Sequence, residues 1–160
     1  MPQHCILIIE DQEDIAAMYE SILHSAGFKV RKTHSGEEGL AEFKANGGDL
    51  VLLDMTLPEI HGTQVLREIR ERNATIPVVV ITANDDPRIK KQCENLGVKR
   101  FLIKPIDVQE LLATIYESLQ TPAEESELVT LRLPVRIANH LRSIDPNLGN
   151  AITTLVEREL

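Results

Sequence analysis

The sequence has few cysteines and no long hydrophobic run. Its two cysteines, Cys5 and Cys93, lie far apart and without the Cys/His spacing of a zinc site, so we expect neither a disulfide framework nor zinc. The first apolar run, residues 5–9, stops at Glu10 and Asp11 and is too short for a signal peptide or a membrane span. We therefore expect a cytoplasmic protein in a reducing compartment, with no membrane partner.

An excess of positive charge is also absent. The chain has 17 lysines and arginines against 25 aspartates and glutamates, a formal net charge of −8, which argues against binding nucleic acid through overall charge but leaves a local basic surface open. The length of 160 residues, with 42% hydrophobic and 26% charged residues, is typical of one globular domain, alone or with a small appendage.

Short apolar runs alternate with longer amphipathic stretches through the first three quarters of the chain. This rhythm predicts an α/β fold, a doubly wound parallel sheet with helices on both faces. The expected strands are residues 5–9, 28–32, 50–53, 78–81 and 101–103, and the expected helices are 13–26, 36–45, 63–72, 87–96 and 108–119. The first, third and fourth strands are almost wholly apolar and should be central, whereas Lys29 and Arg31 place the second strand at an edge.

Polar residues follow the expected strands where a sheet of this kind binds ligands. Glu10 and Asp11 follow the first strand, Asp54 the third, Thr82 the fourth and Lys104 the fifth. Three converging carboxylates repel one another unless a cation such as Mg²⁺ lies among them, with Asp11 and Asp54 as direct ligands and Glu10 acting through water. The Lys104 ammonium and the Thr82 hydroxyl could bind a phosphoryl group, the first as a positive charge and the second as a hydrogen-bond donor. We therefore expect Asp54 to be the nucleophile that forms an acyl phosphate, a carboxylate that needs no general base at about pH 7.

With Leu57, Pro58 and Gly62 after Asp54, and Pro105 after Lys104, these residues resemble the receiver domain of bacterial two-component response regulators over residues 1–119. The resemblance implies a flavodoxin-like strand order, 2-1-3-4-5. It also implies a cis bond before Pro105 and a partner that is a histidine kinase or phosphotransfer protein.

The resemblance further assigns roles to four residues. It implies that the backbone carbonyl of Thr56 binds the metal, and that Phe101 is an aromatic switch residue that moves with Thr82. Thr56 and Asn84 occupy the positions that tune phosphate lifetime in the family. For Phe101, an ordinary place in the core is an equally open reading.

The remainder of the chain has a different pattern. We expect residues 120–127 to be a polar, acidic linker. The pattern of residues 128–160 predicts a strand and two helices, a segment too short to bury its apolar face alone. This segment resembles a ribbon-helix-helix module of the Arc and MetJ type, which implies a dimer that places a two-stranded ribbon in the major groove of DNA. The tail has little net positive charge, and binding as a tetramer would compensate for the modest DNA affinity expected of one dimer. The outward side chains would be Leu128, Thr130 and Arg132, with Arg132 the main base contact, and backbone amides near Gly149 and Asn150 would bind a phosphate.

Three functions remain open from the sequence. The first is a phosphorylation-controlled transcriptional regulator that is no enzyme beyond self-catalysed phosphoryl transfer and autodephosphorylation. The second is a signalling adaptor whose tail only dimerises or docks a protein, with Arg132 a solvated charge. The third is a phosphatase or hydrolase that uses the same metal site. It is disfavoured because the sequence pattern indicates no separate general acid or general base.

Overall fold

The structure is a computed structural model that describes residues 3–83 and 85–119. Strands and helices alternate through this part. In chain order the elements are β1 (Cys5–Ile9), α1 (Glu13–Ser25), β2 (Lys29–Thr33), α2 (Gly36–Asn46), β3 (Leu50–Asp54), α3 (Gly62–Arg72), β4 (Val78–Thr82), α4 (Pro87–Asn95), β5 (Arg100–Ile103) and α5 (Val108–Leu119). The predictions for Asn84, the linker and the tail lie outside the described residues.

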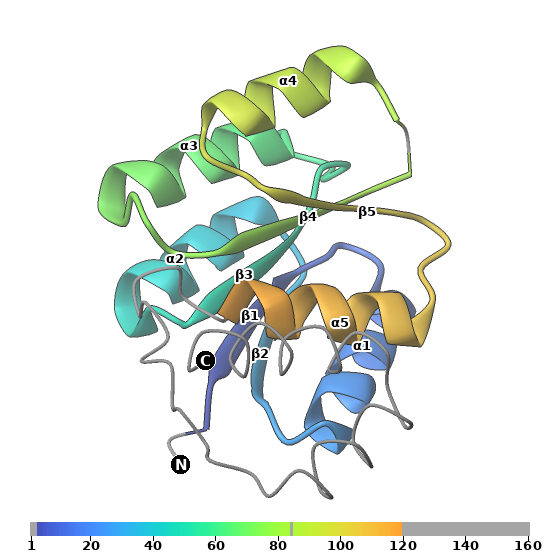
Figure 1. Cartoon of the computed structure of the whole chain (residues 1–160). Coiled ribbons are helices and arrows are strands. Elements are labelled where there is room, and N and C mark those ends of the chain that lie inside the picture. Colours follow the sequence, from blue (N-terminus) through green and yellow to red (C-terminus); the bar gives the residue numbers. More distant parts are fainter. Residues whose placement is uncertain (1–2, 84, 120–160) are drawn as a thin grey trace, which may run out of the picture. The chain divides into compact units, whose positions relative to one another are not determined.

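The five strands form one parallel sheet in the order β2-β1-β3-β4-β5, which confirms the predicted fold and the edge position of β2. Helices α2, α3 and α4 cover one face of the sheet, and α1 and α5 cover the other (Figure 1). Among the described residues, no helix combines the length and apolar character needed to cross a membrane.

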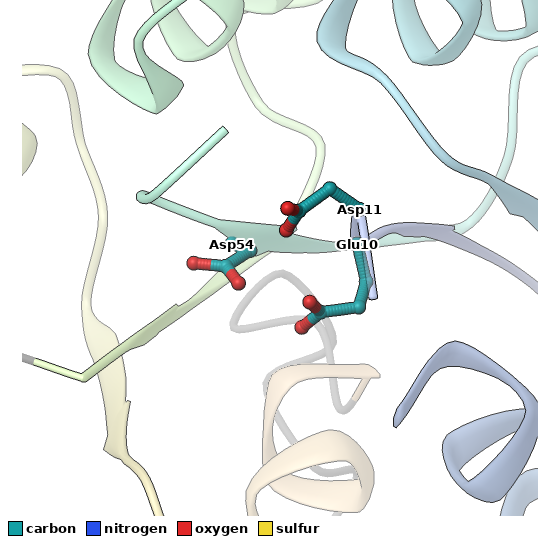
Figure 2. Close-up of side chains that lie close together, drawn as sticks. All are labelled: Glu10, Asp11 and Asp54. Carbon is teal, nitrogen blue, oxygen red and sulfur yellow. The ribbon is translucent and has the colours of Figure 1, made fainter. Parts of the chain in front are cut away.

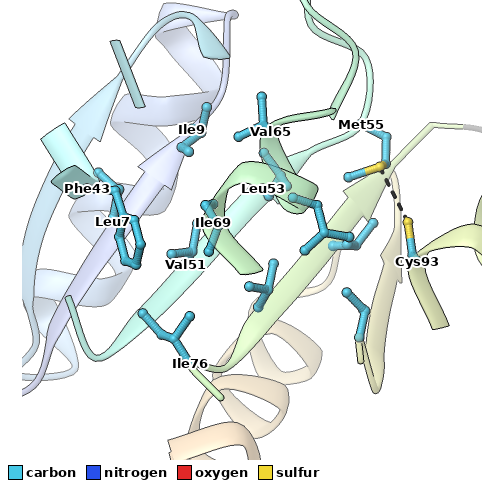
Figure 3. Close-up of a cluster of buried hydrophobic side chains, with 14 of the residues drawn as sticks. Leu7, Ile9, Phe43, Val51, Leu53, Met55, Val65, Ile69, Ile76 and Cys93 are labelled. Atoms are coloured by element: carbon cyan, nitrogen blue, oxygen red, sulfur yellow. Dashed lines mark hydrogen bonds between the residues drawn. The ribbon is translucent and has the colours of Figure 1, made fainter. Parts of the chain in front are cut away.

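The central strands are apolar because both of their faces are covered. Successive residues of β1 alternate between two cores: Leu7 and Ile9 pack under α2 and α3, whereas Ile6 and Ile8 pack under α1 and α5. Figure 3 shows the first of these cores, where the Cys93 thiol of α4 lies 3.7 Å from the Met55 sulfur. Packing on both faces holds the sheet in place, and so it also positions the edge of the sheet where the polar residues lie.

Every predicted boundary of a strand or helix agrees with the structure to within one residue. The second strand begins at Lys29, not at Phe28, because the Phe28 amide donates to the Leu23 carbonyl at the end of α1 while Lys29 starts the pairing with Cys5. Gly27 lets the chain leave α1 and turn into β2, because its φ of 90° is a conformation that glycine adopts readily.

Candidate functional site

Three carboxylates meet at the carboxyl ends of β1 and β3. Ile9 pairs with Leu53 in the parallel ladder, so the next residues, Glu10 and Asp54, come side by side, and Asp11 joins them from the turn before α1. One oxygen from each carboxylate lies within 4.8 Å of the other two, and Figure 2 shows the three groups pointing toward one another. Glu10 and Asp54 are only 1% and 2% exposed, so their charges are largely removed from water.

Lys104 connects two of these carboxylates. The pairing of Thr82 with Ile103 brings the end of β5 beside the end of β4. From there the ammonium nitrogen of Lys104 donates to Glu10 Oε2 at 2.8 Å and to Asp54 Oδ2 at 2.7 Å. The bond from Lys104 to Pro105 is cis, as the resemblance implied. A cation thus lies within hydrogen-bond distance of the expected nucleophile.

Burial and charge set the protonation of this cluster. Burial raises the pKa of Glu10 to about 7; the hydrogen bond from Lys104 opposes this rise, and the negative charge of Asp54 adds to it. Burial alone would lower the pKa of Lys104, but its hydrogen bonds to Asp54 and Glu10 raise it above the ordinary lysine value. Lys104 therefore carries its charge throughout the neutral range, while Glu10 changes charge within that range.

The cluster fits a magnesium ion. Oxygen Oδ1 of Asp11 is buried and has no hydrogen-bond partner among residues 3–83 and 85–119, which is unusual for a charged acceptor. Both oxygens of Asp54 are used, because Oδ1 accepts from the Thr56 amide at 2.8 Å and Oδ2 from Lys104. Mg²⁺ is usually bound through one or two carboxylates and keeps several waters, and this cluster offers carboxylates of that kind.

The other predicted site residues lie on β4, on β5 and in the loop after β3. Thr82 is buried at the end of β4, and Phe101 is partly buried in β5. Thr56 is exposed in the loop after β3.

Two contacts at or near the site were not predicted. The Gln12 amide donates to Glu10 Oε1 at 3.2 Å, and the Lys90 ammonium lies 5.6 Å from the centroid of the Phe101 ring. The contact between Gln12 and Glu10 joins residues two positions apart in the turn between β1 and α1, so the sequence could have indicated it. The second joins α4 to β5, and no spacing in the sequence signals it.

Comparisons with known proteins agree with this geometry. The family model described as "Response regulator receiver domain" matches residues 6–116. The uncharacterized transcriptional regulatory protein YkoG of Bacillus subtilis is 37% identical over 122 residues, which cover 76% of this chain and 54% of that protein. The response regulator ArlR of Staphylococcus saprophyticus is 36% identical over 121 residues, with the same two shares. The chain spans about half the length of these curated relatives.

Solved structures show the same fold. A CheY-like receiver domain protein from Methanospirillum hungatei superposes with a TM-score of 0.72 at 26% identity, covering 74% of this chain and 94% of that one. The CheX-CheY-BeF3-Mg complex of Borrelia burgdorferi gives a TM-score of 0.70 at 28% identity, covering 74% and 90%. With the family model matching well over half of its residues, the chain belongs to the response regulator receiver domain family.

Proposed function

We propose that this chain is the phosphoryl acceptor of a two-component system and that Asp54 is the residue phosphorylated. The observation that carries the proposal is the meeting of Glu10, Asp11 and Asp54 within 4.8 Å, with Lys104 donating to two of them. The donor would be a histidine kinase or phosphotransfer protein, a partner inferred from the family.

In the proposed reaction an Asp54 oxygen forms a bond to the phosphorus of the donor. The bond from phosphorus to the donor's leaving atom breaks, and its electron pair stays with the donor. Lys104, now 2.7 Å from Asp54 Oδ2, would pair with a phosphoryl oxygen, and the Thr82 hydroxyl would donate to another. Burial of Asp54 keeps water away from the nucleophile before transfer.

Glu10, Asp11 and Asp54 would hold Mg²⁺, together with the backbone carbonyl of Thr56. When bound, the ion supplies positive charge that offsets the negative charge of the transferring group. Autodephosphorylation would end the signal at a rate influenced by the side chains of Thr56 and Asn84, and Phe101 would move with Thr82 when the phosphoryl group arrives.

The acceptor assignment is tested with a small phosphodonor. The full chain is incubated with acetyl phosphate and Mg²⁺, and incorporated phosphate is counted for wild type, Asp54→Asn and Asp49→Asn. Asp49 is the matched control because it precedes β3, whereas Asp54 ends it. We expect labelling of wild type and Asp49→Asn and none of Asp54→Asn; full labelling of Asp54→Asn would refute the assignment.

We further propose that phosphorylation controls DNA binding by a dimeric, or tetrameric, ribbon-helix-helix tail. The support is the sequence pattern of residues 128–160, in which Thr130 and Arg132 would face the bases, and the similarity to YkoG, which is named a transcriptional regulatory protein. The alternative is an adaptor whose tail only dimerises or docks a protein.

Arg132→Ala distinguishes these two outputs. Binding to genomic DNA fragments is measured with and without a phosphoryl mimic, and light scattering reports the oligomeric state. Arg158→Ala serves as the control, since residue 158 lies outside the expected ribbon. A dimeric Arg132→Ala protein that no longer binds DNA supports the regulator, whereas DNA binding absent from wild type favours the adaptor. Equal DNA binding by all three proteins would refute Arg132 as the base contact.

A further inference from the structure

A small cavity lies behind Thr82, on the α4 side of the sheet. Its volume is about 100 Å³, and Thr82, Val80, Ile89, Lys90 and Phe101 are among the residues that line it. Its walls therefore connect the end of β4, beside Asp54, with the ring of Phe101 on β5 and the lysine on α4. A change in the side chain of Thr82 alters the shape of a space that Phe101 shares.

The Phe101 ring is held from the α4 side by a charge. Lys90 is exposed, and its ammonium lies 5.6 Å from the ring centroid, within the range of a cation–π interaction. An exposed contact of this kind changes an equilibrium by about two- to fivefold. Lys91, the next residue on α4, is also exposed and makes no ion pair or ring contact within the described part of the chain.

We propose that Lys90 is a positioning residue that holds the Phe101 ring in its present place and so opposes the phosphorylated arrangement of the domain. The inference rests on the proposed function, in which the Thr82 hydroxyl turns toward a phosphoryl group on Asp54. That turn enlarges the cavity on the Thr82 side, and an unfilled apolar space forfeits packing contacts.

Phe101 is the side chain that can fill this space. It lines the cavity, it is large, and it is only partly buried, so inward movement removes apolar surface from water. A ring that moves inward leaves the position in which Lys90 contacts its face. The contact therefore stabilises the unphosphorylated arrangement only, and its loss should shift the equilibrium toward the phosphorylated one.

The test follows the Phe101 ring by NMR in the full chain. The sequence has only 3 phenylalanines, so ring-labelled [13C]phenylalanine gives few signals, and Phe101→Leu identifies the one that belongs to Phe101. Phe28 and Phe43 serve as internal references. Wild type, Lys90→Met and Lys91→Met are titrated with beryllofluoride, a phosphoryl mimic, at constant Mg²⁺, and both substitutions remove one positive charge from the same helix.

We expect the beryllofluoride concentration that half-shifts the Phe101 signal to fall about two- to fivefold in Lys90→Met and to stay at the wild-type value in Lys91→Met. Equal values for the two variants, or a higher value for Lys90→Met, would overturn the role of Lys90. Phosphate incorporation from acetyl phosphate is measured on the same proteins. Normal incorporation without a Lys90 effect refutes this inference alone, whereas no incorporation into wild type refutes the proposed function and this inference with it.

Discussion

Replacing Lys104 with methionine tests the electrostatics of the site most severely. Methionine keeps most of the length of the side chain but removes the ammonium group that donates to Glu10 and Asp54. Both carboxyl groups are almost fully buried, so Lys104→Met leaves Asp54, and Glu10 where it is ionised, without the cation that offsets their negative charge. We expect the folded chain to be strongly destabilised in the absence of Mg²⁺.

The size of the effect follows from burial. Breaking a buried ion pair costs about 3–5 kcal/mol, because the remaining charge is left uncompensated. Lys32 provides the control: its ammonium lies 2.6 Å from Glu20, but both side chains are more than a quarter exposed. Breaking a surface pair of this kind costs about 0.2–1 kcal/mol.

The assay is urea unfolding followed by circular dichroism, with EDTA and with saturating Mg²⁺. Because the ion would neutralise the same carboxylates, Mg²⁺ should recover at least half of the stability lost in Lys104→Met and should not change the smaller loss in Lys32→Met. A loss below about 1 kcal/mol without Mg²⁺, or a loss that Mg²⁺ leaves unchanged, would refute this account of the cluster.

Two further predictions concern the same edge of the sheet. Since the pKa of Glu10 is raised from 4.5 to about 7, the folded chain binds its proton more tightly than the unfolded chain does, and the stability contributed by Glu10 in Mg²⁺-free buffer falls as pH rises through that range. Glu10→Gln should therefore gain stability relative to wild type between about pH 5 and about pH 8 in urea unfolding, and a constant difference would contradict the burial argument. Gly62→Ala should lower the free energy of unfolding by about 1–3 kcal/mol and slow phosphorylation of Asp54. The added Cβ would lie 2.7 Å from the Asp54 carbonyl oxygen, whereas in the control Gly48→Ala it meets nothing closer than 3.5 Å, so equal losses in the two variants would argue against a steric cause.

The fold was predictable because a strand whose two faces are both buried has an unbroken run of apolar residues in the sequence. The apolar runs of β1, β3 and β4 identified the central strands, and acidic or hydroxyl residues at their ends indicated the edge of the sheet where a site would form. The start of β2 was missed by one residue because Phe28 closes α1 through its amide and is apolar like a strand residue. Spacing along the chain also gave no sign of the contact between Lys90 and Phe101, which depends on how α4 packs against β5.

Phosphorylation of Asp54 is the central claim, and borohydride trapping tests it directly. The full chain is treated with acetyl phosphate and Mg²⁺ and then reduced with borohydride, which converts an acyl phosphate of aspartate to homoserine. Peptide mass spectrometry then locates the change. We predict homoserine at position 54 and at no other aspartate. Homoserine at another position, with Asp54 intact, would contradict the account.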